Sequence, residues 1–211
     1  MHGIPFNESY AKYCWGKMLD LIGNEIGTAA LLGNWVRESY MLPFIVQGDT
    51  LNTYSYSQDY TAKVDAGTIS RDQFTRHGPR GGGYGLAQWT YYTRKEGLYD
   101  LHISTGYSIG SAQLGCEFAK QELQTNYTST LNELQNATDL YAATGYVMRN
   151  YEQPADQSTA AQQRRYLSAQ DIYELCTGLP PDPDPPTPEP PTPPIYHRRK
   201  TPLWMYLKRK Y

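Results

Sequence analysis

The stretch GNWVRESYMLP, residues 33–43, places one acidic residue, Glu38, in an apolar and aromatic run. On a helix, Leu31, Trp35 and Glu38 lie at positions i, i+4 and i+7, so they share one face. The low dielectric of such a face and the negative end of the helix dipole both disfavour a charged carboxylate. A carboxyl group that keeps its proton can act as a general acid. A solvated glutamate at a helix end would give the same pattern.

Helical periodicity extends to both sides of this stretch. Apolar residues at three- and four-residue steps predict a helix over 9–22, with Ser9 as its N-cap. The next helix is predicted over 28–40, with Thr28 as its N-cap and with Pro43 closing the segment. The motif that carries Glu38 therefore forms the end of the second helix.

The rest of the chain up to residue 178 is also predicted to be mainly helical. The same pattern predicts four more helices, over 108–124, 128–135, 138–151 and 158–176. Residues 44–83 are polar and rich in Thr, Tyr, Asp and Gly, and pieces such as TLNTYSYS favour loop with a small hairpin. The expected fold is a mainly α-helical domain with a small β or loop lobe.

The composition suits a globular domain that binds a long polar ligand. The chain has 211 residues and 39% hydrophobic residues, which is adequate for one core. Tyrosine outnumbers phenylalanine by 20 to 4. Tyrosine offers a flat contact surface with a polar tip, which fits sugars or peptides, but also a half-buried core with hydroxyl groups at its rim.

Charge and proline content divide the chain into three parts. Residues 180–194 contain ten of the fifteen prolines, which is typical of an extended spacer. Residues 195–211 carry six basic and no acidic side chains, so residues 1–194, with 13 basic and 21 acidic ones, have a net charge of −8. We therefore expect a domain at 1–178, a proline-rich linker at 179–194 and a basic aromatic tail at 195–211.

A second informative stretch is GGGYGLAQWT, residues 81–90. Its glycines let the backbone approach a ligand closely. The amide of Gln88 can donate to and accept from an N-acetyl group, and Tyr84 and Trp89 offer faces for sugar stacking. A glycine-rich turn that leads into a helix is the simpler interpretation of this segment.

A glycosidase commonly needs a second carboxylate. Four aspartates, Asp49, Asp59, Asp65 and Asp72, lie between the two stretches. Asp65 follows Val64 and precedes Gly67, so it is the candidate at a structured turn facing a cleft, although turn aspartates are common.

Other chemistries fit the sequence less well. Cys14 with a histidine would suit a thiol peptidase or amidase, but Cys14 falls on the apolar face of its helix, where a buried structural thiol is expected. The scattered histidines and three cysteines give no metal spacing, and RHGPRGGG lacks the GK[ST] of a phosphate loop. No metal, cofactor or nucleic-acid partner is expected.

The N-terminus lacks the charged and apolar regions of a signal peptide, and no apolar run reaches the ~18 residues of a membrane span. We therefore expect synthesis in the cytoplasm without a signal peptide. The basic tail at 195–211 is expected to meet an anionic polymer or a membrane surface.

Five segments in order resemble the phage tail lysozyme family, and together they run from about residue 8 to residue 176. They read AALLGNWVRESYMLP, YTAKVDAGTI, GYGLAQWTYYTRKEGL, ATDLYAATGYVMRNYEQPADQS and RRYLSAQDIYE. The resemblance implies a lysozyme-like domain that cuts the glycan of bacterial peptidoglycan in tail-tip proteins and endolysins. It matches Glu38 to the catalytic glutamate and Gly85–Trp89 to the cleft segment. The NYEQPADQS segment around Glu152 implies a structural helix junction.

The resemblance, together with these residues, predicts a muramidase or a lytic transglycosylase, which would cleave the β-1,4 bond between N-acetylmuramic acid and N-acetylglucosamine by hydrolysis or by transglycosylation. Glu38 would be the general acid, Asp65 the second carboxylate, and Tyr84, Gly85, Gln88 and Trp89 would bind substrate. The site of action would be the bacterial cell wall, as a released endolysin or a virion tail component. The alternatives are a wall-glycan-binding module without activity and a Cys14-dependent enzyme acting on the peptide stem.

Overall fold

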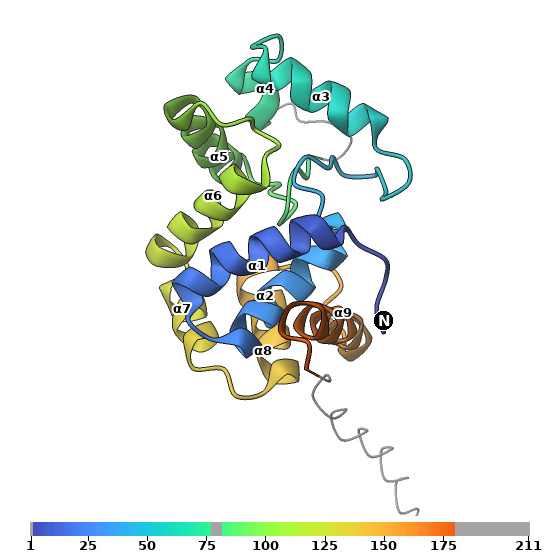
Figure 1. The fold of residues 1–211 in the computed structure, drawn as a ribbon. Coiled ribbons are helices and arrows are strands. Elements are labelled where there is room, and N and C mark those ends of the chain that lie inside the picture. The colour runs from blue at the N-terminus through green and yellow to red at the C-terminus, as the bar shows by residue number, and fades with distance from the viewer. Residues whose placement is uncertain (1, 77–81, 180–211) are drawn as a thin grey trace, which may run out of the picture.

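The computed structural model describes residues 2–76 and 82–179 of the chain. The expected linker and basic tail, apart from Leu179, lie outside these residues. The described residues are mainly helical, and Figure 1 shows the helices arranged in an upper and a lower lobe. The elements are α1 (Glu8–Ile22), α2 (Glu25–Ser39), α3 (Ser55–Asp65), α4 (Arg71–Arg76), α5 (Tyr92–Thr105), α6 (Ala112–Thr125), α7 (Thr128–Gln135), α8 (Leu140–Val147), the π-helix η1 (Met148–Glu152) and α9 (Thr159–Thr177).

Helix α2 is the centre of the lower lobe, which comprises α1, α2, α7, α8, η1 and α9 (Figure 1). It packs against four helices, and 11 of its 15 residues are buried. A Cβ atom added at Gly33 would lie 2.5 Å from the Cα atom of Ala169. Because real Cβ atoms do not approach backbone so closely, the glycine of the GNWVRES motif is what lets α9 lie directly on α2.

Two asparagines begin the first helices. The side chain of Asn7 accepts a hydrogen bond from Tyr10 N, and that of Asn24 accepts one from Gly27 N. The N-caps predicted at Ser9 and Thr28 were therefore wrong by a few residues, although both helices were predicted correctly. Asparagine and serine satisfy the same free backbone N–H groups, so the pattern alone did not choose between them.

The upper lobe comprises residues 44–76 and 82–111 with the first part of α6, and it is helical. The predicted mainly α-helical fold is confirmed, but the small β or loop lobe is not, because α3 and α4 occupy most of residues 55–76. Strand-like pairing among the described residues is limited to isolated bridges, which join Val46 to Tyr84, Thr50 to Thr53, and Tyr84 to Trp89. Ser57, Tyr60 and Val64 are the buried residues of α3, at a helical spacing of three and four, and this burial overrides the strand preference of tyrosine and threonine.

None of the described helices is both long and apolar enough to cross a membrane.

Candidate active site

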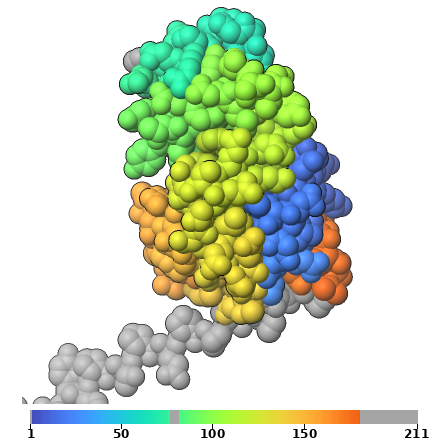
Figure 2. Space-filling model, turned by 90° about the vertical axis from the view of Figure 1, so that its left-hand side faces the viewer, coloured from blue at the N-terminus to red at the C-terminus, as the bar shows by residue number. Residues whose placement is uncertain are grey.

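A cleft of about 670 Å³ lies between the two lobes. The lower lobe contributes the end of α2 and residues 151–155, and the upper lobe contributes residues 45–50, the 87–91 region and Arg94. In the space-filling view, green atoms of the upper lobe and orange atoms of the lower lobe meet at a notch in the left-hand outline (Figure 2). The two stretches that stood out in the sequence, around Glu38 and Gln88, therefore face one cleft.

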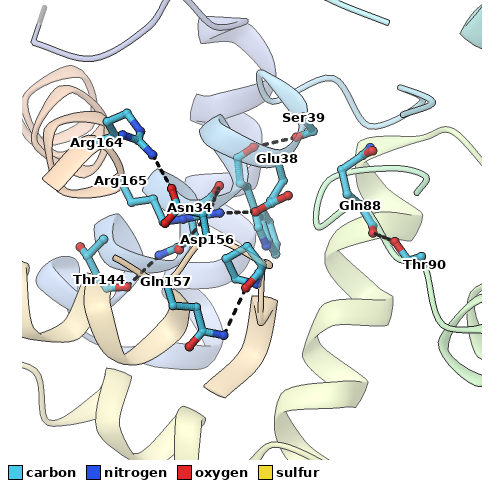
Figure 3. Close-up of polar contacts among 12 residues, drawn as sticks. Asn34, Glu38, Ser39, Gln88, Thr90, Thr144, Asp156, Gln157, Arg164 and Arg165 are labelled. Carbon is cyan, nitrogen blue, oxygen red and sulfur yellow. Dashed lines mark hydrogen bonds and ion pairs between the residues drawn. The ribbon is translucent and has the colours of Figure 1, made fainter. Parts of the chain in front are cut away.

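Glu38 lies in the last turn of α2, and its side chain is 20% exposed. Its Oε1 atom accepts a hydrogen bond of 2.6 Å from Nη2 of Arg165, on α9 (Figure 3). The predicted apolar setting was therefore wrong for the carboxylate itself, because a guanidinium group faces it. The sequence pattern could not reveal this partner, which stands 127 residues away.

Arg165 is buried, and it bridges Glu38 and Asn34 (Figure 3). Its Nη1 atom donates to Oδ1 of Asn34 at 3.2 Å and to the Asn34 carbonyl oxygen at 3.4 Å. Asn34 in turn donates from Nδ2 to the carbonyl oxygens of Ala30 and Thr144. The glycine, asparagine and glutamate of the GNWVRES motif thus have linked tasks, which are close packing, orientation of Arg165 and presentation of a carboxylate.

The GYGLAQW segment forms a tight turn on the opposite side of the cleft. Tyr84 and Trp89 pair through both backbone hydrogen bonds, and Gly85 has a positive φ of 78° that favours glycine. Gln88, which is half-buried, lines the cleft, and its Nε2 atom donates to the carbonyl oxygens of Ile45 and Gly85, both at 3.1 Å. Gln88 therefore fastens one wall of the cleft, and Figure 3 shows it across from Glu38.

Comparison with known proteins identifies the family of this chain. The family model for phage tail lysozyme matches residues 10–176, which include every described residue that lines the cleft. The chain belongs to the phage tail lysozyme family. Searches of curated proteins and of solved structures gave no significant match. The predicted family is confirmed, and it implies a lysozyme-like hydrolase whose substrate is peptidoglycan.

Two residues predicted to stack on sugars are buried in this tail lysozyme domain. Tyr84 has no exposed surface, and its hydroxyl group lies 2.6 Å from Oγ1 of Thr61. Trp89 is 1% exposed, and its Nε1 atom donates to Oε2 of Glu122 at 2.9 Å. Neither ring reaches the cleft lining. The aromatic residues that do line it are tyrosines from other segments: Tyr40, Tyr91, Tyr127 and Tyr151.

Glu122 is the centre of a buried polar network that joins the lobes. Arg94 makes two hydrogen bonds to its carboxylate, at 2.6 and 2.8 Å, and Trp89 and the Tyr151 hydroxyl group donate to it at 2.9 and 2.8 Å. The Arg94 guanidinium also lies over the rings of Tyr127 and Tyr151. Because the charge of Glu122 is fully compensated, this network can hold both walls of the cleft in fixed positions.

The four loop aspartates occupy different environments. Asp65 is not among the described residues that line the cleft, and it accepts hydrogen bonds from Ser108 Oγ and Ile109 N at 2.6 and 2.8 Å. It therefore fastens the segment before α6. Asp49 lines the cleft, and its Oδ2 atom accepts from both the backbone N–H and the hydroxyl group of Ser57. Asp59 and Asp72 form exposed ion pairs with Lys63 and Arg76.

The sequence did not single out Glu152 as a chemical group, but the structure places it in the cleft lining. It is the last residue of η1, and it is half-buried. Its Oε1 atom is buried and has no hydrogen-bond partner among the described residues. Burial first, and then the negative charge of Glu38, raise the pKa of Glu152 well above its ordinary value, while Arg94 and Arg165 oppose the shift. The described lining of the cleft thus contains three acidic side chains, Glu38, Asp49 and Glu152, and the charges of Glu38 and Glu152 influence each other.

Cys14 lies in the core beside Cys116 and is not among the residues that line the cleft. A hydrogen bond with Cys116, together with burial, raises the pKa of the Cys14 thiol well above its usual value. Because the thiolate is the nucleophile, this environment does not suit a thiol peptidase or amidase.

A cluster of potential metal ligands lies outside the cleft lining, where His2, Asp171 and Glu174 come together. The two carboxylate oxygens of Asp171 accept hydrogen bonds from the backbone N–H groups of His2 and Gly3, at 2.5 and 2.6 Å. Asp171 thereby fastens the N-terminal segment to α9.

Proposed function

We propose that this protein cleaves the β-1,4 bond between N-acetylmuramic acid and N-acetylglucosamine in bacterial peptidoglycan, with Glu38 as a catalytic carboxyl group. The observation that carries the proposal is that Glu38 stands in the cleft between the lobes, held by the buried Arg165, in a chain of the phage tail lysozyme family. Enzymes that cleave glycosidic bonds commonly use carboxyl groups that lie beside the bond in a cleft.

The lining of the cleft suits a glycan strand. It combines exposed aromatic surface, most of all Tyr91, which is 71% exposed, with the polar side chains of Gln47 and Gln153. Sugar rings have apolar faces and polar edges, so tyrosines can stack on the faces while amides bind the hydroxyl and N-acetyl groups. The abundance of tyrosine in the sequence thus serves binding, through residues other than Tyr84.

Among the described residues, two cations also line the cleft, Arg37 and Arg94. Arg94 forms an ion pair with Glu122. Arg37 makes no hydrogen bond or ion pair within the described part of the chain, and burial and the nearby Arg164 and Arg165 lower its pKa. An unpaired guanidinium group beside Glu38 fits the carboxylates of the peptide stems that peptidoglycan carries.

The proposal is tested with purified walls and two matched variants. The wild-type protein should release new reducing ends or anhydro-sugar ends, identified by mass spectrometry of the muropeptides. Glu38→Gln keeps the shape and removes the ionisable group, so we expect the rate to fall by at least about 100-fold. Glu133→Gln, on α7 outside the cleft lining, makes the same chemical change and should leave the rate unaltered.

Two outcomes would overturn the proposal. Wall binding without new glycan ends would indicate a binding module, whereas release of free amino groups would indicate an enzyme that cuts the peptide stem. Circular dichroism of each variant verifies that a lost rate does not reflect lost folding.

We further propose that the protein acts at the bacterial cell wall, as a released lysis enzyme or as part of a phage tail. The basic residues of 195–211 would then add attraction to anionic wall polymers or membrane surfaces.

A further inference from the structure

Glu152 is a cleft residue whose carboxyl group is incompletely partnered. It lines the same cleft as Glu38, and its Oε1 atom is buried without a hydrogen-bond partner among the described residues. An ionised carboxylate in that position would leave a charged oxygen without solvent or donor, which is costly. A protonated carboxyl group avoids that cost, and it has a proton to give.

The charges around Glu152 come from four helices. The nearby charged groups are Glu38 of α2, Arg94 of α5, Glu122 of α6 and Arg165 of α9. Both arginines already bind another carboxylate, since Arg94 pairs with Glu122 and Arg165 with Glu38. Of the three carboxyl groups of Glu38, Glu122 and Glu152, that of Glu152 is therefore the one without an ion pair among the described residues. Two carboxyl groups near each other also resist simultaneous ionisation.

Glu152 lies at the end of an uncommon backbone element, a π-helix. The turn Met148–Glu152 is a π-helix, in which Gln153 N donates to Met148 O at 2.9 Å, and Gln153 has a positive φ of 51°. π-Helical turns are rare in proteins, and those that occur are often found at functional sites. Tyr151, the neighbour of Glu152, is anchored by its hydrogen bond to Glu122.

We propose that Glu152 is a second catalytic carboxyl group of the cleft, and that it holds the proton which the glycosidic oxygen takes up while Glu38 is the ionised partner. This inference rests on the proposed glycosidase function. It moves the role of general acid, which the sequence predicted for Glu38, to Glu152. Arg165 stabilises the negative charge of Glu38, whereas no cation among the described residues forms an ion pair with Glu152.

The reaction balances with these two groups. The proton of Glu152 moves to the oxygen that links the two sugars, the bond between that oxygen and the anomeric carbon breaks, and the leaving sugar departs as an alcohol. The Glu38 carboxylate stabilises the positive charge that develops at the anomeric carbon. Water, or the 6-hydroxyl group of the same sugar, then attacks that carbon and returns its proton to Glu152.

The first test compares rates against pH for the wild-type protein, Glu152→Gln and the control Glu133→Gln. Removal of a general acid should lower the rate by about 10²–10⁴-fold, with the fold intact. The alkaline limb of the wild-type profile should be absent in Glu152→Gln and present in the control. A Glu152→Gln variant with more than a third of the wild-type rate and an unchanged alkaline limb would overturn the proposal.

The second test does not depend on activity. The carboxyl carbons of ¹³C-labelled glutamate are titrated by NMR in the wild-type protein, with Glu152→Gln used to assign the Glu152 signal. Because the charge of Glu38 opposes ionisation of Glu152, Glu38→Gln should move the Glu152 midpoint to lower pH, and Glu133→Gln should leave it in place. A Glu152 signal that titrates like an exposed glutamate would refute the inference. If Glu152 titrates as expected but the wild-type protein releases no new glycan ends, the proposed function fails instead.

Discussion

At the scale of single residues, the cleft depends on Arg165 as a positioning group. Its Nη2 atom donates to Glu38 and its Nη1 atom donates to Asn34. The side chain is buried, and it belongs to α9. A planar group with donors in a fixed fork can serve both partners at once, which a lysine ammonium cannot do with the same geometry.

We expect Arg165→Lys to lower kcat about 10-fold with little change in KM, because the charge remains while the orientation of Glu38 is lost. The free energy of unfolding should fall by about 1–3 kcal/mol, since the buried oxygen of Asn34 loses its donor. Steady-state kinetics on soluble glycan fragments and urea unfolding measure the two effects. A loss confined to stability, with kcat unchanged, would show that Arg165 is structural only.

Sequence reasoning found the cleft residues that belong to a motif and missed Arg165 and Glu152, whose positions depend on tertiary structure. Glu38 and Gln88 stand in patterned stretches, and both line the cleft. Tyr84 and Trp89 stand in the same stretch as Gln88, but their rings fill the core, because a large aromatic residue gains more from burial than from exposure. Glu152 gave no signal, since its burial and its charged neighbours come from other helices.

At the scale of elements, α5 supports the glycine-rich turn through a buried lysine. Lys95 is 1% exposed, its Nζ atom donates to the carbonyl oxygen of Gly82 at 3.1 Å, and it lies over the ring of Phe74. Burial lowers the pKa of Lys95 to about 8. The folded protein therefore releases this proton near pH 8, whereas the unfolded chain holds it to about pH 10.4.

Between these pH values the unfolded state binds more protons, so the contribution of Lys95 to the free energy of unfolding rises with pH. We expect the stability of the wild-type protein relative to Lys95→Met to increase by at most about 3 kcal/mol from pH 7.5 to pH 10. Urea unfolding at several pH values measures this difference, with Lys12→Met, at an exposed position, as control. A difference that stays constant over this range would contradict the assignment.

The elements that the sequence missed are the helices of the upper lobe. The predicted helices of the lower lobe exist to within a few residues, because α2 and its neighbours bury continuous apolar faces. Helices α3, α4 and α5 carry few apolar residues, and tyrosine and threonine favour strands, so no periodic stripe marked them. The predicted hairpin failed for the same reason.

At the scale of the whole molecule, the end of α9 coincides with the domain boundary that the sequence predicts at residue 178. Helix α9 ends at Thr177, and Gly178, with a positive φ of 70°, closes it by donating its N–H to the carbonyl oxygen of Glu174. The family match ends at residue 176, and every described residue that lines the cleft precedes residue 156. We therefore predict that the fold and the cleft do not depend on the residues after Leu179.

Truncation after Leu179 should therefore leave the melting temperature within a few degrees of that of the full chain and leave cleavage of soluble glycan fragments unchanged. Binding to whole walls or anionic vesicles should differ, because the six basic side chains of 195–211 are lost. Each cation near an anionic surface contributes about 1 kcal/mol, and salt screens the attraction. Cosedimentation should thus show weaker binding by the truncated protein at low salt, and the difference should vanish at high salt. Equal binding at low ionic strength would show that the basic tail does not tether the domain, while a lower rate on soluble fragments would show that the tail assists the cleft directly.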